Sequence, residues 1–197
     1  ASTLEHYASL SRPNVFKMEI SEQYGWSGMH RDLRVFDSPG MSDLWDIALK
    51  YKMAVMFDTG LIGTNGYQTE QFAKLADAYP SLPIIIEHGC MCKNDFDTDS
   101  ELRPQWDAMA KLGRKENIYM GLTAIVETAG NMERAMWVLE HLLNIAGERK
   151  IVWGSDIPGN MRFWTYNNLI EWAEKAPCLS ERQKDLFLAQ NMLDMFK

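Results

Sequence analysis

The stretch Ile151-Val-Trp-Gly-Ser-Asp-Ile-Pro158 decides how the rest of this sequence is interpreted. Its apolar run stops at Gly154, and Pro158 has no backbone N–H with which to continue a strand. We therefore expect a buried strand that delivers the carboxylate of Asp156 to the point where the strand ends. Strand alternation would place Val152, Gly154 and Asp156 on one face, and Gly154 would then leave space beside the acid.

Two earlier apolar runs also end in a polar side chain. Residues 52–57 lead to Asp58, and residues 82–87 lead to His88. The carboxyl ends of parallel strands meet at one edge of a sheet, so three such groups predict a catalytic site at the strand ends. For each residue taken alone, capping of the following turn is the alternative explanation.

The composition is that of a folded globular chain of 197 residues, with 46% hydrophobic and 24% charged residues. This length predicts one domain over residues 1–197. The formal net charge is −7 and no basic stripe is present, so we expect neither nucleic acid nor a membrane as a partner. Three cysteines, a low and odd number, favour free thiols in a reducing compartment, which predicts a cytoplasmic protein.

Strand and helix patterns alternate along the chain. Strands are expected near residues 15–20, 52–58, 82–88, 117–125 and 151–156, with amphipathic helices between them, and two helices follow at 167–176 and 180–196. Ser42 and Ser100 are expected to cap two of the helices. Strict alternation predicts an α/β fold with a parallel sheet, either open and doubly wound or part of a (β/α)₈ barrel. No glycine-rich nucleotide-binding pattern follows a strand, which favours the barrel.

Three segments together resemble a known family. Ile84-Ile-Ile-Glu-His-Gly89 resembles a strand end of the amidohydrolase superfamily, in its amidohydrolase-related branch. The Ile151–Pro158 stretch is similar to the Gly-Ser-Asp-aromatic-Pro strand end of that branch, and Gln190–Phe196 is similar to its closing helix. The resemblance implies a (β/α)₈ barrel. It also implies an enzyme of the lactonase, hydratase, isomerase or aromatic-acid decarboxylase type, with one divalent metal ion or none.

The resemblance also implies roles for individual residues. Asp156 matches an aspartate that binds metal or acts as a base toward water, and His88 matches a histidine that orients substrate or moves protons. Asp58 stands where many members place a metal-ligating histidine. Asp58, His88 and Asp156 are therefore the candidate ligands for one Zn²⁺ or Mn²⁺ ion. Glu19, with Lys17 two positions before it on the same face, lies where other members of the superfamily place an acid or lysine ligand.

Four residues near the strand ends are expected to contact the substrate. Arg31 and Arg162 suit a small carboxylate through bidentate pairing, and Trp153 can wall an apolar pocket. Glu19 completes this set. Solvated surface positions for the arginines and core packing for the tryptophan are the alternatives.

The sequence also departs from the family pattern. The first strand of the family carries a His-x-His pair, and none of the four histidines here is spaced in that way. The chain would therefore supply only strands four to eight of a barrel that usually needs roughly 250 residues. Five strands leave two unpaired edges, which favour association. We expect a fragment of a longer protein, or an oligomer in which a second chain supplies the missing strands.

The expected activity is hydrolysis of a small-molecule lactone or a similar C–O bond. Asp156 would be the base, and His88 the electrophile or proton shuttle. Non-oxidative decarboxylation of a carboxylic acid is the alternative on the same fold. The alternative outside catalysis is a partial barrel that binds a partner chain through its exposed edges.

Overall fold

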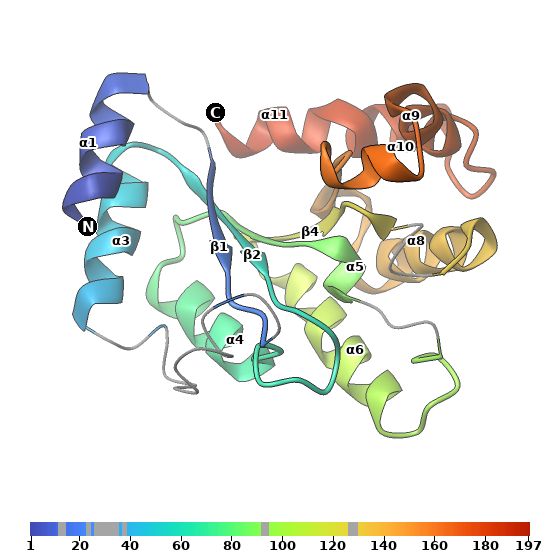
Figure 1. Cartoon of the computed structure of the whole chain (residues 1–197), viewed down its shortest axis with the longest axis horizontal. Coiled ribbons are helices and arrows are strands. Elements are labelled where there is room, and N and C mark those ends of the chain that lie inside the picture. The colour runs from blue at the N-terminus through green and yellow to red at the C-terminus, as the bar shows by residue number, and fades with distance from the viewer. Residues whose placement is uncertain (12–14, 23–24, 26–35, 37–38, 92–94, 126–129) are drawn as a thin grey trace.

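The computed structural model describes residues 1–11, 15–22, 25, 36, 39–91, 95–125 and 130–197, in which strands alternate with helices (Figure 1). The strands are β1 (Val15–Glu19), β2 (Ala54–Asp58), β3 (Ile84–Ile86), β4 (Ile118–Leu122) and β5 (Ile151–Trp153). The longer helices are α1 (Ser2–Ser11), α3 (Pro39–Lys50), α4 (Thr69–Ala78), α6 (Leu102–Lys111), α8 (Met132–Ala146) and α9 (Tyr166–Glu174). The shorter helical segments are α5 (His88–Met91), η1 (Leu112–Arg114), η2 (Glu148–Lys150), η3 (Gly159–Arg162), α10 (Glu181–Asp185), η4 (Leu186–Gln190) and α11 (Asn191–Met195).

The strands form one five-stranded parallel sheet in the order β1-β2-β3-β4-β5. Each strand pairs with the next one along the chain, and the helices between them make the crossovers. A doubly wound sheet reverses its strand order at a switch point, and this sheet has no such reversal. The predicted α/β fold with five parallel strands is confirmed, and the order is the one expected for part of a barrel.

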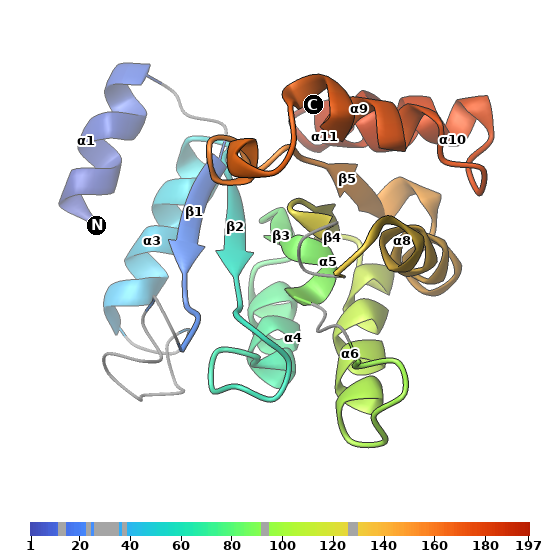
Figure 2. The ribbon, with the colours of Figure 1, turned by 45° about the vertical axis from the view of Figure 1, so that its right-hand side comes forward.

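The two faces of the sheet are covered differently. The outer face packs on the helices, through side chains that include the buried Phe57 and Ile86. The inner face carries the buried Ala54, Ile85 and Val152, on which the C-terminal residues Met192, Met195 and Phe196 pack. Figure 1 shows α11 on one side of the sheet and α4 and α6 on the other, and Figure 2 shows β1 and β2 side by side with the same direction.

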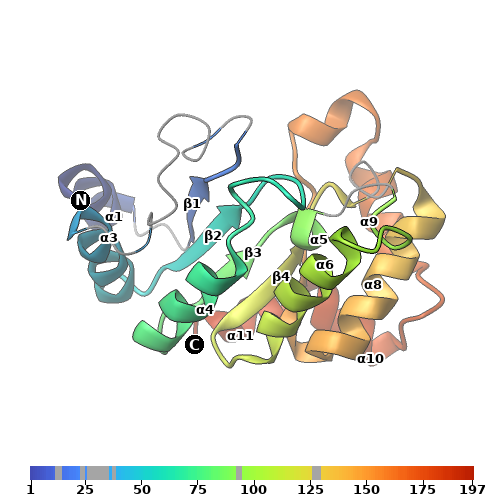
Figure 3. The ribbon, with the colours of Figure 1, turned by 90° about the horizontal axis from the view of Figure 1, so that it is seen from below.

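The described residues that directly follow the strands lie at one edge of the sheet, which is the upper edge in Figure 3. This arrangement follows from the parallel order, because every strand ends on the same side. Any side chains that work together at the strand ends are therefore brought close although they are far apart in the sequence. Among the described residues, no helix has the length and apolar character needed to cross a bilayer.

Both predicted helix caps are wrong. Helix α3 begins at Pro39, so Ser42 lies inside the helix; proline is tolerated in a first turn because its missing N–H has no intrahelical partner there. At the start of α6, Asp99 Oδ1 accepts hydrogen bonds from two backbone N–H groups, at 2.8 and 2.9 Å. Asp99 therefore caps this helix in place of Ser100.

Candidate active site

Three acidic side chains lie in a row across the inner face at the ends of β1, β2 and β3. Glu19 is the register partner of Asp58, and the β2–β3 register places Glu87 beside Asp58. Strand alternation puts this acid row on the same face as Lys17, two residues before Glu19. The row consists of Glu19, Asp58 and Glu87.

Lys17 forms an ion pair with the most buried member of the acid row. Its Nζ lies 2.6 Å from Glu87 Oε2, and the exposed fractions of the two side chains are 44% and 4%. Burial lowers the pKa of Lys17, but the hydrogen bond to Glu87 and the charges of Glu87, Asp58 and Asp156 outweigh burial and raise the pKa above its ordinary value. Lys17 is therefore a cation within electrostatic reach of Asp156.

The imidazole ring of His88 is fixed at both nitrogens. Its Nδ1 lies 3.0 Å from the carbonyl oxygen of Thr123 and 2.8 Å from Thr123 Oγ1, and its Nε2 lies 3.3 Å from Asp58 Oδ2 and 4.0 Å from Glu87 Oε2. The carbonyl oxygen can only accept, so these partners assign the proton of a neutral ring to Nδ1. Nε2 then faces two carboxylates. This arrangement is favourable when Nε2 carries a proton or shares a cation with the carboxylates.

The pKa values in the site are shifted in opposite directions. Burial would lower the pKa of His88, but the hydrogen bond to Asp58 and the charges of Glu87 and Asp58 raise it. Burial would raise the pKa of Asp58, but the hydrogen bond and charge of His88 and the N–H of Gly60 lower it to about 2. Burial and the neighbouring Asp58 raise the pKa of Glu19.

The backbone turns sharply where His88 leaves β3. His88, Gly89 and Cys90 have φ angles of 58°, 59° and 63°. Strand alternation therefore stops at Glu87 and no longer governs the direction of the His88 side chain. A Cβ on Gly89 would lie 2.8 Å from Ile125 Cδ1, so this turn also needs glycine for close packing.

Asp156 lies beyond β5 and also has a left-handed backbone, with φ 52°. Its carbonyl oxygen accepts the N–H of Asn160 at 3.0 Å. The predicted reason for Gly154 is wrong, because a Cβ there would lie 2.3 Å from Thr123 Cγ2. The space beside Gly154 is filled by Thr123, the residue that holds His88, and is not left open beside Asp156.

The other residues expected to contact substrate differ in their positions. Trp153 packs with the helices of the outer face, and its indole N–H donates to the Leu169 carbonyl at 3.2 Å, so it is held away from the acid row. Glu19 Oε1 accepts the backbone N–H of Ser21 at 3.0 Å. Arg31 and the side chain of Arg162 lie outside the described residues, and their contact with a substrate stays a prediction.

Asp58, Glu87 and His88 fit a divalent metal ion. Each offers one ligand atom, and the three atoms lie within 4.8 Å of one another. Carboxylate oxygen and imidazole nitrogen are ligands that Zn²⁺ and Mn²⁺ accept, and a metal-ligating histidine usually donates its other N–H to a carbonyl, as His88 does to Thr123. Sequence reasoning named two of the three. It missed Glu87, although the alternation of Ile85 and Glu87 was a signal for it.

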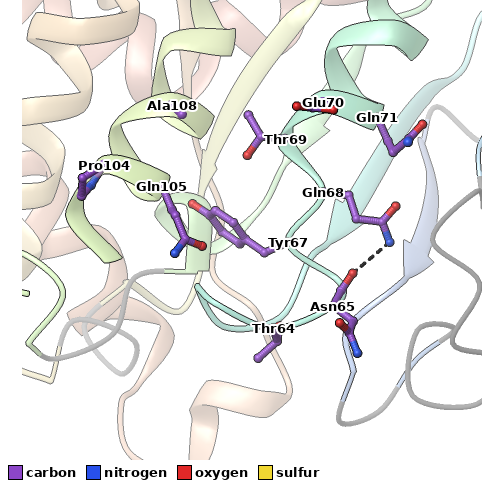
Figure 4. A pocket seen from close by; sticks show the side chains of 10 residues that line it. All are labelled: Thr64, Asn65, Tyr67, Gln68, Thr69, Glu70, Gln71, Pro104, Gln105 and Ala108. Atoms are coloured by element: carbon purple, nitrogen blue, oxygen red, sulfur yellow. Dashed lines mark hydrogen bonds between the residues drawn. The ribbon is translucent and has the colours of Figure 1, made fainter. Parts of the chain in front are cut away.

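A separate groove of about 620 Å³ lies between the loop after β2, the start of α4 and the start of α6 (Figure 4). Most of the described residues that line it are of uncharged polar types, and Glu70 is the one charged residue among them. The lining residues are Thr64, Asn65, Tyr67, Gln68, Thr69, Glu70, Gln71, Pro104, Gln105 and Ala108. Neither the acid row nor His88 takes part, so this groove is distinct from the strand-end site.

Parallel β/α units with acids and a histidine at the strand ends define a barrel-type enzyme fold with a strand-end site. The amidohydrolase family model (Amidohydro_2) matches residues 26–197, and the chain belongs to this family. The comparison with curated proteins gives no match.

Solved structures share the fold at low sequence identity. An amidohydrolase from Burkholderia multivorans is 14% identical and gives TM-scores of 0.77 with bound HEPES and 0.74 with bound zinc, over 100% of this chain and 70% or 69% of that one. A putative 2-pyrone-4,6-dicarboxylic acid hydrolase from Pseudomonas putida is 17% identical, with a TM-score of 0.71 over 99% of this chain and 67% of that one. The 5-carboxyvanillate decarboxylase from Sphingomonas paucimobilis is 12% identical, with a TM-score of 0.62 over 99% and 62%.

The chain thus spans 62–70% of the length of these proteins, all of which are amidohydrolase-type barrels. This agreement confirms the predicted fold class, a (β/α)₈ barrel type that is represented here by five strands. It also confirms the family suggested by the three sequence segments.

Proposed function

We propose that the protein is a hydrolase that opens a lactone or a similar C–O bond in a small carboxylate substrate, with one divalent metal ion. The environment of His88 carries this proposal. Its Nδ1 lies 3.0 Å from the Thr123 carbonyl, and its Nε2 faces the carboxylates of Asp58 and Glu87. A histidine held in this way is suited to bind a metal ion together with those carboxylates.

The proposed metal-binding roles follow from the positions of the side chains, and the roles of Asp156, Arg31 and Arg162 follow from the sequence. Asp58, Glu87 and His88 would hold the metal ion, which when bound supplies a Lewis acid that polarises the substrate carbonyl. Asp156, outside this ligand group, is the proposed general base toward water, and Arg31 and Arg162 are the proposed partners of the substrate carboxylate. Without metal, the raised pKa of His88 favours an imidazolium that can serve as the electrophile.

The comparisons support this choice of chemistry. Structures of a probable and a putative 2-pyrone-4,6-dicarboxylic acid hydrolase are among the similar folds, and the first was solved with citric acid bound. The amidohydrolase from Burkholderia multivorans was solved with bound zinc. Those ligands and activities belong to the neighbours. For this chain, lactone hydrolysis, zinc and a carboxylate substrate are proposals.

Turnover of 2-pyrone-4,6-dicarboxylate tests the proposal, with ring opening followed as the loss of the pyrone absorbance. We expect activity with added Zn²⁺ or Mn²⁺ and its loss in EDTA. Asp156→Asn should lower kcat by about 10²–10⁴-fold, because it removes the base. Asp77→Asn, near the C-terminal end of α4 with its side chain 70% exposed, is the matched control and should keep wild-type activity. Retained activity of Asp156→Asn would remove Asp156 from the reaction.

Decarboxylation is the second candidate function, because two decarboxylases share the fold. They are the 5-carboxyvanillate enzyme and a 2,6-dihydroxybenzoate decarboxylase from Rhizobium. The same metal ligands would serve this reaction. Release of labelled CO₂ from a ring-carboxylated substrate, without a hydrolysed product, would favour decarboxylation over hydrolysis.

A further inference from the structure

Two basic side chains, Lys17 and His88, face the same oxygen of the Glu87 carboxylate. Its Oε2 lies 2.6 Å from Lys17 Nζ and 4.0 Å from His88 Nε2. This carboxylate is one of the three groups that fit a metal ion. The ammonium group of Lys17 therefore lies on the same Glu87 oxygen that faces His88, the other basic member of the site.

Glu87 cannot stay without a positive partner. Its side chain is only 4% exposed, and a buried carboxylate without a compensating charge is strongly unfavourable. The Lys17 side chain is 44% exposed and long, so it can move toward solvent without unfolding the strand. A metal ion bonded to Glu87 would also repel an ammonium group held at its present distance. Binding of the metal is then an exchange of one cation for another.

We propose that Lys17 is an internal cation that competes with the divalent metal ion for Glu87 and so weakens metal binding at this site. The inference rests on the proposed metal site of Asp58, Glu87 and His88. It assigns Lys17 a positioning role: in the metal-free protein it neutralises the acids, and in the metal-loaded protein it is displaced.

Metal titration of the Lys17→Met variant tests this inference. Methionine has a similar length and no charge, so we expect the Kd for Zn²⁺ and Mn²⁺, measured by calorimetry on the EDTA-treated protein, to fall at least tenfold. In EDTA the variant should unfold at a lower temperature than the wild type, because Glu87 has lost its partner. Added Zn²⁺ should raise its unfolding temperature by more than it raises that of the wild type.

Two further variants separate the local effect from general ones. Lys17→Arg keeps the charge and should leave the Kd within about threefold of the wild-type value. Lys50→Met removes the same charge from the exposed Lys50–Glu5 pair and should leave the metal affinity unchanged. If Lys17→Met does not fold, Lys17→Gln can hydrogen-bond to Glu87 and gives the same test.

The outcomes distinguish this inference from the proposed function. If the wild-type protein binds metal and Lys17→Met binds it with unchanged or weaker affinity, the role of Lys17 is overturned and the metal site stands. An equal fall of the metal Kd in Lys50→Met also overturns the role of Lys17. No metal binding by any variant overturns both the metal site and the competition. Tighter binding in Lys17→Met alone supports the inference.

Discussion

The Asp58–His88 pair links the stability of the metal-free protein to pH. The pKa of Asp58 is lowered from 3.8 to about 2, so its contribution is present above 3.8 and is lost as the pH falls toward 2. The pKa of His88 is raised from 6.5, so its contribution is present below 6.5 and is lost as the pH rises through the raised value. The Asp58–His88 pair therefore contributes most to the stability of the fold between pH 3.8 and pH 6.5.

Asp58→Asn should accordingly cost more unfolding free energy at pH 5.5 than at pH 9. We expect a cost of about 1–2 kcal/mol at pH 5.5, reduced from the full linkage value because Asp58 keeps some contact with solvent. Urea unfolding in EDTA at both pH values measures the difference. Asp77→Asn is the control, because its partner is Lys115 and its cost should not follow a histidine titration. Equal costs for Asp58→Asn at the two pH values would contradict the pairing.

Residues of the site could be predicted from the sequence only where the neighbouring residues form a recognisable strand end. Asp58 follows an apolar run directly, and His88 follows one after a single acid, Glu87, which is visible in the sequence. Glu87 was hidden because its run also fits a strand that is buried on both faces, and its partner Lys17 lies in another strand. Asp156 was predicted from its motif and stays a prediction, and its left-handed backbone, with φ 52°, does not follow the strand alternation on which its predicted direction depended.

At the level of elements, β5 and the end of β4 are coupled through Gly154. A Cβ at this position would lie 2.3 Å from Thr123 Cγ2. Gly154→Ala should therefore cost about 1–3 kcal/mol of unfolding free energy through overpacking. It should also weaken Zn²⁺ binding, because Thr123 holds the ring of His88.

A double variant identifies the cause. Thr123→Ser keeps the hydroxyl group beside His88 and removes the methyl group that the new Cβ would meet. Gly154→Ala with Thr123→Ser should regain most of the lost stability and metal affinity, as measured by urea unfolding and calorimetry. Gly40→Ala is the control, since nothing lies within 4 Å of its added Cβ and the position is inside α3. A double variant no more stable than Gly154→Ala would show that the methyl contact is not the cause.

Helix and strand positions were predictable because their periodicity is local, whereas exact ends and close contacts were not. Asn131 and Ser180 start helices as their residue types predict, with side-chain bonds to the N–H groups of Arg134 and Gln183. The first turn of α6 is capped by Asp99, one residue before the predicted Ser100, through the N–H groups of Glu101 and Leu102. The clash at Gly154 depends on two chain segments meeting, which no local pattern contains.

For the whole molecule, the sequence predicted the family and the strand order because both follow from motifs and alternation. It could not show how the inner face is covered. Met192, Met195 and Phe196 pack on Ala54, Ile85 and Val152, and this contact joins the end of the chain to three separate strands. Within the described residues, β1 and β5 each pair with one neighbouring strand. The solved relatives contain further chain beyond the part that this protein matches.

Unpaired strand edges and exposed apolar side chains together predict that the 197-residue chain self-associates. Four large apolar side chains are exposed between β5 and the start of α9: Ile157 by 38%, Met161 by 61%, Phe163 by 60% and Tyr166 by 48%. We expect the average mass in sedimentation equilibrium to rise with concentration above the monomer mass. Met161→Ser with Phe163→Ser should lower it toward the monomer, because it removes exposed apolar surface from the segment after β5.

The matched control removes equally exposed apolar side chains at a different place. Tyr7→Ser with Leu10→Ser alters α1, where the exposed fractions are 60% and 68%, and should leave the average mass unchanged. Unfolding by urea must show that both double variants keep the wild-type fold. A wild-type chain that stays monomeric at all concentrations would mean that its edges are protected without a partner. An equal effect of both double variants would mean that association depends on apolar area in general and not on the segment after β5.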